Sequence, residues 1–305
     1  MRTAAICLAS LFIVLSPPTC VGQLTRLTFD SARDWDPSWS PDGQFLAFTS
    51  DVTGVNHLYT IPVTGGTPTQ LTFGAYPDMH PCWSADGQLI AFCSERSGNQ
   101  DIWTVPAAGG EPSRVTTSPY RDESLGWSHG GDMITFDSNR ASNNWDVWII
   151  PRGGGTAERL TTTAGYDTGP CGSPDGTQIA FSSSRTGTHS VWVLSSDGTN
   201  QTQLTFTSSM CVGPVWSRDG RMLGYNSNPD DNWDLWMIPS TGGEPTRLTD
   251  DAANDLYIDW APDGSRIAFS SDRTGDDELY IMDLTLLTGL TQERSSWGRI
   301  KALYR

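Results

Sequence analysis

Trp39-Ser40-Pro41-Asp42-Gly43 decides the fold, because these five positions return five more times along the chain. The further copies lie at residues 83–87, 127–131, 172–176, 216–220 and 260–264, at intervals of 44, 44, 45, 44 and 44 residues. A Leu-Thr or Val-Thr pair, first seen at Leu27-Thr28, follows the same interval. A repeat of about 40–45 residues is typical of β-propeller blades. The sequence therefore predicts six blades.

Each repeat contains the patterns of four short strands. The first strand ends at the Trp position and turns through Pro-Asp-Gly or a variant, whose residues favour tight hairpin turns. The second reads aliphatic-Ala-Phe in most copies, as in Ile90-Ala91-Phe92, and the third carries an aromatic residue such as Trp103. A Gly-rich turn then leads to an outer strand that ends in Leu-Thr. The predicted fold class is all-β, a six-bladed β-propeller of four-stranded antiparallel blades.

The ring is expected to close through the N-terminal strand. The sixth repeat lacks the Gly-Gly turn, whereas residues 24–28 match the outer strand of the fifth repeat at residues 245–249. Completion of the last blade by residues 23–29 would remove the open edge of the sheet. We therefore predict a propeller over residues 23–284 and a C-terminal tail over residues 285–305.

Residues 1–22 resemble a signal peptide. Arg2 supplies a positive charge, residues 4–15 are almost entirely apolar, and small residues precede Gln23. We expect cleavage before Gln23 and a periplasmic or secreted mature protein, with lipidation of Cys20 as the alternative. No later stretch reaches the ~20 apolar residues that a transmembrane helix needs.

Charge and cysteine content restrict the partners. The formal net charge of −16 disfavours nucleic acid and anionic lipid and favours a basic partner, although solubility alone also explains it. The four cysteines after residue 22 could form two disulfides in three different pairings, and they are Cys82, Cys93, Cys171 and Cys211. Their spacing predicts neither a metal site nor a cofactor, and we expect a monomer.

Acidic residues gather before the Trp position, in the loop that leads from one blade to the next. In a propeller these loops surround the mouth of the central channel. The residues expected there are Asp34, Asp36, Asp78, His80, Asp122, Glu123, Tyr166, Asp167, Asp255, Tyr257 and Asp259. They could form an acidic binding surface, or the repeated Asp residues could hydrogen-bond their own loops. The non-repeating residues are the better candidates for specific contacts.

An arginine recurs after the second strand in four repeats. Three of these arginines precede an acidic residue at the start of the third strand. We expect the resulting ion pairs to lie within the blades, joining Arg96 to Asp101, Arg140 to Asp146 and Arg273 to Glu278.

The Trp-Ser-Pro-Asp-Gly turn, the Ile-Ala-Phe strand and the Ser-x-Arg-x-Gly loops, as at residues 94–98, resemble the TolB-type branch of the WD-repeat-like propellers. The resemblance covers residues 23–284. The propeller of TolB binds a peptidoglycan-associated lipoprotein, so the resemblance implies a non-catalytic scaffold that binds a protein or peptide, such as an envelope lipoprotein, over the channel mouth. The N-terminal α/β domain of TolB has no counterpart in this sequence.

Enzymatic function is the main alternative. No Gly-x-Ser-x-Gly nucleophile elbow is expected, because the one match to this motif, at residues 126–130, falls in the predicted hairpin turn of the third repeat, and no residue is singled out as catalytic. Acidic residues and His80 at the mouth could still serve a hydrolase or lyase as acid and base. Carbohydrate or metal binding without turnover is a third possibility.

Overall fold

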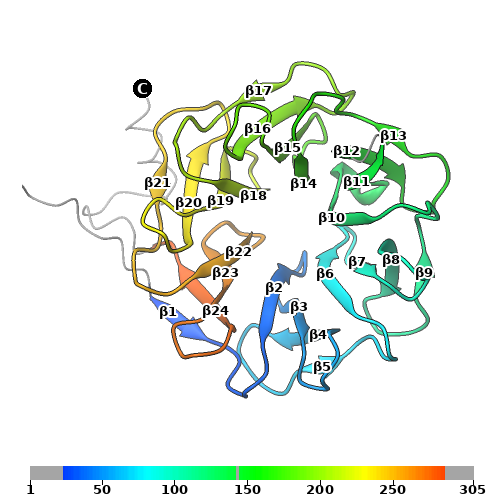
Figure 1. Ribbon diagram of the computed structural model, residues 1–305. Helices are drawn as coiled ribbons and strands as arrows, with labels where there is room; N and C mark the ends of the chain where they lie inside the picture. The colour runs from blue at the N-terminus through cyan, green and yellow to red at the C-terminus, as the bar shows by residue number, and fades with distance from the viewer. Residues whose placement is uncertain (1–22, 142–143, 286–305) are drawn as a thin grey trace, which may run out of the picture.

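The computed structural model describes residues 23–141 and 144–285, which form six four-stranded antiparallel sheets arranged as a ring (Figure 1). The proposed signal peptide and nearly all of the C-terminal tail lie outside the described residues. Blades 1 to 6 follow the order of the chain. Their inner strands are β2 (Asp34–Trp39), β6 (Asp78–Trp83), β10 (Asp122–Trp127), β14 (Asp167–Gly172), β18 (Cys211–Trp216) and β22 (Asp255–Trp260).

The remaining strands of each blade follow outward from the ring centre. The second strands are β3 (Phe45–Ser50), β7 (Leu89–Ser94), β11 (Met133–Ala141), β15 (Gln178–Ser183), β19 (Met222–Ser227) and β23 (Arg266–Ser271). The third strands are β4 (His57–Pro62), β8 (Asp101–Pro106), β12 (Asn144–Pro151), β16 (Ser190–Ser195), β20 (Asp234–Pro239) and β24 (Glu278–Asp283). The outer strands are β5 (Thr69–Gln70), β9 (Ser113–Arg114), β13 (Glu158–Arg159), β17 (Thr202–Gln203), β21 (Thr246–Arg247) and β1 (Leu24–Arg26). A short 3-10 turn, η1 (His129–Gly131), replaces the Pro-Asp-Gly hairpin in blade 3.

The N-terminal strand closes the ring, as the sequence predicts. Strand β1 pairs antiparallel with β24, with Leu24 opposite Met282 and Arg26 opposite Tyr280 (Figure 1). The Thr28 hydroxyl then accepts a hydrogen bond from the Leu279 amide at 3.0 Å, and the same contact recurs in the other five blades. This contact explains the Leu-Thr repeat, because the hydroxyl satisfies a third-strand amide where the short outer strand ends.

The hydrophobic core lies between the blades. Ile90 and Phe92 of β7 are fully buried, and they pack with Leu58 and Ala47 of blade 1. Both faces of a blade meet a neighbour, so the small Ala between the two large side chains is buried as well. The aromatic side chains of the repeats therefore form the core.

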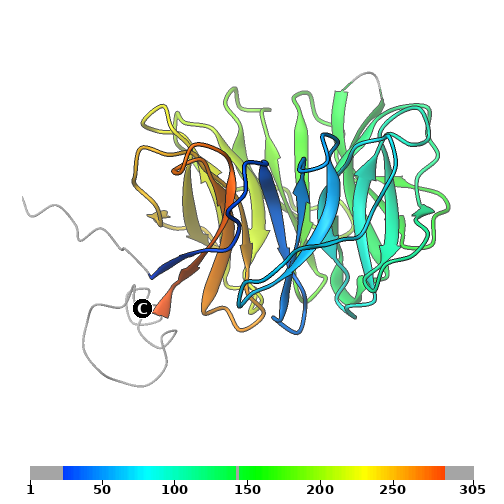
Figure 2. The same ribbon diagram turned by 90° about the horizontal axis from the view of Figure 1, so that it is seen from below.

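Antiparallel strands divide the connections between two faces of the disc (Figure 2). The Pro-Asp-Gly hairpins and the Gly-rich turns lie on one face, here called the turn face. The loop face carries the inter-blade loops at residues 27–33, 71–77, 115–121, 160–166, 204–210 and 248–254. It also carries the loops between second and third strands, to which the inter-blade loops are tied by backbone hydrogen bonds such as Asp78 N to Asn56 O at 2.9 Å. Among residues 23–141 and 144–285, no helix has the length and apolar character of a membrane span.

Candidate functional site

The repeated aspartates at the start of the inner strands are buried inside the blades. Asp122 is fully buried, and both of its carboxylate oxygens accept hydrogen bonds from Arg140 at 2.7 Å. The same ion pair recurs in three other blades, between Asp78 and Arg96, Asp167 and Arg185, and Asp255 and Arg273. The Arg140 guanidinium also stacks near Phe136 and Trp148. These carboxylates hold the loop after the second strand against the first strand, and they do not line the channel cavity.

The predicted arginine partners are therefore wrong. The arginine after the second strand turns back to the inner strand instead of forward to the third. The acidic residues of the third strand are paired instead by arginines of the outer strands, which lie beside them in the sheet. These pairs join Arg114 to Asp101, Arg159 to Asp146, Arg247 to Asp234 and Arg26 to Glu278.

Blade 1 keeps the aspartate and lacks the arginine. Val52 occupies the place of the arginine, and Asp34 interacts with the Ser50 and Thr28 side chains. Burial without a cation raises the pKa of Asp34 to about 7. In blade 5 both partners are absent, with Cys211 and Pro229 at these positions. Four of the five repeated aspartates thus have an arginine partner in the same blade.

Two residues further along each inner strand, the backbone turns into the left-handed region. Asp36, His80, Ser124 and Tyr257 have φ values between 40° and 59°. Gly169 and Gly213 take the same position in blades 4 and 5, with φ of 61°. The pairing with the second strand shifts register at each of these positions, which marks a β-bulge. Bulges are frequent beside binding sites, because they redirect a side chain out of the regular sheet.

The bulged backbone is supported from the neighbouring blade. A side chain of the preceding second strand accepts a hydrogen bond from the amide of the bulged residue. Asp137 accepts from Gly169 N at 2.9 Å, and Ser182 accepts from Gly213 N at 3.0 Å. Asn226 takes the same role toward Tyr257 at 3.3 Å. These supporting residues were not predicted from the sequence, although their position directly after the second-strand aromatic is the signal that could have revealed them.

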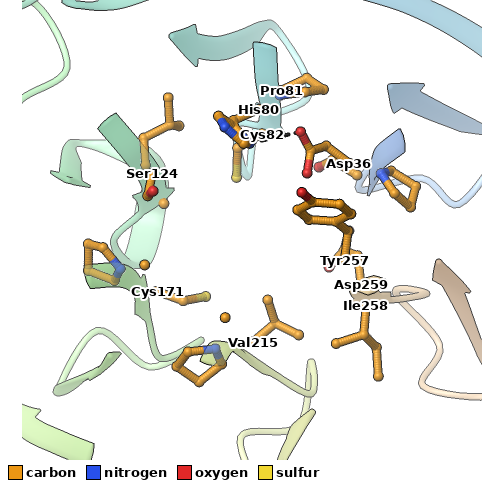
Figure 3. Close-up of a pocket in the computed structure, with 18 of the residues that line it drawn as sticks. Asp36, His80, Pro81, Cys82, Ser124, Cys171, Val215, Tyr257, Ile258 and Asp259 are labelled. Carbon is orange, nitrogen blue, oxygen red and sulfur yellow. Dashed lines mark ion pairs between the residues drawn. The ribbon is translucent and has the colours of Figure 1, made fainter. Parts of the chain in front are cut away.

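The bulges surround a cavity of about 250 Å³ at the channel mouth (Figure 3). It is lined by Asp36, Pro37, Ser38, His80, Pro81, Cys82, Ser124, Leu125, Gly126, Gly169, Pro170, Cys171, Gly213, Pro214, Val215, Asn226, Tyr257, Ile258 and Asp259. Of the residues predicted to lie at the mouth, this cavity brings together Asp36, His80, Tyr257 and Asp259. Ser124, Gly169 and Gly213 are lining residues that the sequence analysis did not single out.

Asp36 and His80 form an ion pair in the cavity wall. The Asp36 carboxylate lies 2.8 Å from His80 Nδ1, and about a third of the His80 side chain is exposed (Figure 3). Burial lowers the pKa of His80, but the negative charges of Asp36, Glu123 and Asp137 outweigh this effect and raise the pKa to about 9. The imidazole is therefore protonated at neutral pH.

Two further carboxylates stand behind this ion pair. Glu123 pairs with Arg121 at 2.7 Å, and burial raises its pKa. Asp137 is almost fully buried, and burial raises its pKa to about 7 while the Gly169 amide opposes the rise. Neither residue lines the cavity, so both act on it through their charge.

Deeper in the channel, Asp259 binds the backbone of two blades. Its carboxylate accepts hydrogen bonds from Trp39 N at 2.7 Å and Trp260 N at 2.9 Å. Asp259 thus lines the cavity and also joins blade 6 to blade 1. The thiols of Cys82 and Cys171 lie at this level, and burial raises their pKa values to about 12 and about 11. All four cysteines of the described residues are free.

The last predicted site residue, Tyr166, lies outside the cavity. Its side chain is exposed on the loop face, in the loop that leads to Gly169. No group of three or more His, Cys, Asp or Glu side chains is arranged to hold a metal ion in the part of the chain that the structure describes.

Comparisons with known proteins agree with this architecture. A family model described as the TolB β-propeller domain matches residues 22–145, 127–229 and 207–299. A solved structure assigned as TolB from Agrobacterium tumefaciens has a TM-score of 0.68 and 26% identity, covering 83% of this chain and 91% of that one. TolB from Acinetobacter baumannii has a TM-score of 0.64 and 18% identity, covering 88% of this chain and 65% of that one.

Enzymes also share the fold. Oligogalacturonate lyase from Vibrio parahaemolyticus has a TM-score of 0.62 and 13% identity, covering 86% of this chain and 93% of that one. At this identity the similarity concerns the fold alone. No curated protein matches the sequence significantly. Because the family model covers more than half of the chain, this protein belongs to the TolB β-propeller domain family.

Proposed function

We propose that this protein is exported after removal of residues 1–22 and acts as a non-catalytic scaffold that binds a protein or peptide over the channel mouth. Family membership and the signal-like N-terminus support this role and suggest a place in the organisation of the cell envelope. N-terminal sequencing of the mature protein is expected to begin at Gln23. Retention of Met1, or a lipid on Cys20, would contradict the export step.

The distribution of exposed apolar side chains carries the binding proposal. Nine of the ten large exposed hydrophobic residues in the described chain lie on the loop face or at its channel mouth. These nine are Phe29, Val52, Phe73, Tyr76, Tyr120, Tyr166, Phe206, Met210 and Tyr257. The tenth, Phe45, lies on the turn face. Apolar side chains concentrated on one face of a soluble protein are typical of an interaction surface.

The charge of the loop face suggests the chemistry of the partner. The described loops of this face carry ten acidic residues and five arginines. Several of the arginines are already engaged, as Arg96 and Arg185 are in their blade-internal pairs. A partner with apolar and basic side chains therefore complements this surface, and its association is expected to slow as salt screens the attraction.

The direct test is selection of binding peptides from a phage-displayed library of random linear peptides, using the immobilised mature protein. Affinity of the recovered peptide is then measured by fluorescence polarisation. Phe206→Ser on the loop face is expected to weaken binding several-fold, whereas the matched variant Phe45→Ser on the turn face leaves it unchanged. Failure to recover a peptide, or equal sensitivity to both variants, would contradict the proposal.

An acid–base enzyme is the second candidate, because His80 lines the cavity with a pKa raised to about 9 and can donate a proton there as a general acid. The buried Asp137, whose pKa is raised to about 7, does not line the cavity and influences His80 through its charge. The oligogalacturonate lyase and a gluconolactonase from Xanthomonas campestris share the fold at 13% and 15% identity. Turnover of oligogalacturonate or a sugar lactone that is lost in His80→Gln and Asp137→Asn would favour this candidate.

A further inference from the structure

The six bulged positions divide the channel mouth into two unlike halves. Blades 6, 1, 2 and 3 place Tyr257, Asp36, His80 and Ser124 there, in adjacent positions around the ring. Blades 4 and 5 place Gly169 and Gly213 there. In a ring of six, blade 4 faces blade 1 and blade 5 faces blade 2. The Asp36–His80 ion pair, drawn in Figure 3, therefore faces across the ring the two positions that carry no side chain.

Local packing does not require these two glycines. A Cβ atom built on Gly169 would come no closer than 3.7 Å to its nearest neighbour, the Cα of Gly213. A Cβ atom on Gly213 would approach Asn226 Oδ1 at 3.7 Å, which is an ordinary contact. The backbone conformation does not require glycine either, because Asp36, His80 and Tyr257 adopt nearly the same φ. Non-glycine residues pay about 1–2 kcal/mol for this conformation, so the four side chains are retained against a conformational cost.

The missing side chains leave room in the mouth beside the bulges of blades 4 and 5. Tyr166 and Met210 are exposed on the loops that lead to Gly169 and Gly213. A polypeptide arriving from the loop face would contact these apolar side chains first. Its backbone could then approach the glycine backbone closely, which side chains at these positions would prevent.

The Asp36–His80 pair, on the wall opposite the two glycines, determines which chemical group of the partner can bind. Asp36 and protonated His80 place a negative and a positive group side by side. A ligand with a single charge is attracted by one of them and repelled by the other. A neutral amide carries a hydrogen-bond donor and an acceptor at neighbouring positions, so both members of the ion pair can bind it. The amide can be a peptide unit at a chain turn or the side chain of Asn or Gln.

We infer that the partner inserts a peptide segment between Gly169–Gly213 and the Asp36–His80 pair, with a neutral amide facing the ion pair. The two glycines then act as the specificity-determining residues, since they decide how wide a segment can enter. This inference rests on the proposed binding function and adds the route and the chemical class of the inserted group.

The experiment is a graded substitution series at Gly213, from Ala to Asn to Tyr. Asn adopts left-handed backbone readily, and Tyr257 shows that a tyrosine fits the equivalent position. The probe is the peptide recovered from the phage-displayed library, measured by fluorescence polarisation. Affinity is expected to fall stepwise, with a loss of about tenfold or more for Tyr. Gly65→Ala is the matched control, because Gly65 lies in a Gly-rich turn of blade 1 on the turn face, with left-handed backbone and open space around its Cβ position.

Each outcome separates the inference from the function on which it rests. Unchanged affinity in Gly213→Tyr, with binding still weakened in Phe206→Ser, contradicts the entry of a peptide segment beside the two glycines. It leaves the proposed binding function intact. Loss of affinity in the control as large as in Gly213→Asn also overturns the inference. Thermal melting is recorded for every variant, and the smallest change, Gly213→Ala, provides the comparison if the Tyr variant does not fold. An Asn or Gln in the peptide whose replacement by Asp or Lys abolishes binding supports the amide assignment, and tolerance of either charge contradicts it.

Discussion

Two positions on the same inner strand, separated by one residue, have opposite character. The repeated aspartate, such as Asp78 in blade 2, is buried and paired with an arginine of its own blade. The bulged position two residues later, His80 in blade 2, faces the channel cavity and carries a different residue type in most blades. A residue that stabilises its own blade is repeated in five of the six blades, whereas a residue that serves one site in the assembled ring is free to differ among blades. Repetition therefore indicates structural roles here, and variation at a shared position indicates the candidate site.

The largest expected effect is the loss of one arginine from a buried pair. In Arg140→Met, Asp122 is left in a fully buried position without its cation. Removal of one partner from such a pair costs about 3–5 kcal/mol of unfolding free energy. Thermal melting would show a drop of about 10 °C.

Blade 5 suggests the matched control, because it has neither the aspartate nor the arginine. The double variant Asp122→Ala, Arg140→Met is expected to recover part of the lost stability, since no buried charge is left unpaired. A loss of unfolding free energy below about 1 kcal/mol in Arg140→Met would mean that the buried pair contributes no more than a surface ion pair. The structural role assigned to the repeated aspartate would then be contradicted.

A second comparison lies within the cavity, between Asp259 and Asp36. Asp259→Ala leaves the amides of Trp39 and Trp260 without their acceptor, which is expected to cost about 2–3 kcal/mol. Asp36→Asn keeps a residue suited to left-handed backbone and loses only a partly exposed ion pair, at about 1 kcal/mol or less. Urea unfolding of the two variants measures the difference, and equal losses would show that both acids are structural.

The third prediction compares Asp137 with Asn226, which support the bulges of neighbouring inner strands. Asn226 accepts from the Tyr257 amide and donates to Asp255 O at 3.1 Å. Burial raises the pKa of Asp137 to about 7 from its usual value near 4, so ionisation destabilises the folded state as pH rises across that interval. Asp137→Asn is expected to be more stable than the unmodified protein by about 1 kcal/mol at pH 8.

The pH profile distinguishes this cause from a general packing effect. The stability difference between Asp137→Asn and the unmodified protein should grow between about pH 4 and pH 7 and stay constant above it. Asp34 also has a raised pKa of about 7, but it is present in both proteins and cancels. A difference independent of pH would contradict the assignment.

The smallest expected effect concerns His80. Its pKa in the folded protein is raised to about 9, above the value of about 6.5 expected in the unfolded chain. The stabilisation by its ion pair is therefore fully present below about pH 6.5 and is lost as pH rises through about 9. His80→Gln should be less stable than the unmodified protein at pH 6, by under about 1 kcal/mol, and equal to it above pH 10. Calorimetry at several pH values measures this difference.

The sequence predicted the fold well because the main features of a blade recur along the chain at a nearly constant interval. The Trp-Ser-Pro-Asp-Gly turn, the second strand and the Leu-Thr contact all recur, and the match between residues 24–28 and 245–249 revealed the closing strand that pairs with β24. The candidate site was predicted less well. Distance along the chain does not show that Asp78 points into its blade while His80 points into the channel, because a bulge lies between them.

The prediction of the arginine pairs was wrong for a similar reason. Arg140 and Asp146 are close in sequence, but the Arg140 guanidinium turns back to Asp122 on β10. The glycines of the channel were overlooked because a residue without a side chain gives no chemical signal of its own. Their meaning appears only when the six bulged positions are compared in the closed ring.

The most direct test of the central claim compares two variants of strand β6. Asp78→Asn and His80→Asn each place an asparagine on the same strand, one in the blade and one at the channel. Thermal midpoint and affinity for the peptide recovered by phage selection are measured for both. We expect Asp78→Asn to lower the thermal midpoint by several degrees and to leave the affinity unchanged at a temperature where this variant is folded. We expect His80→Asn to keep the thermal midpoint and to lose affinity. The reverse result, or loss of both properties in both variants, would contradict the assignment of structure to the repeated position and of function to the variable one.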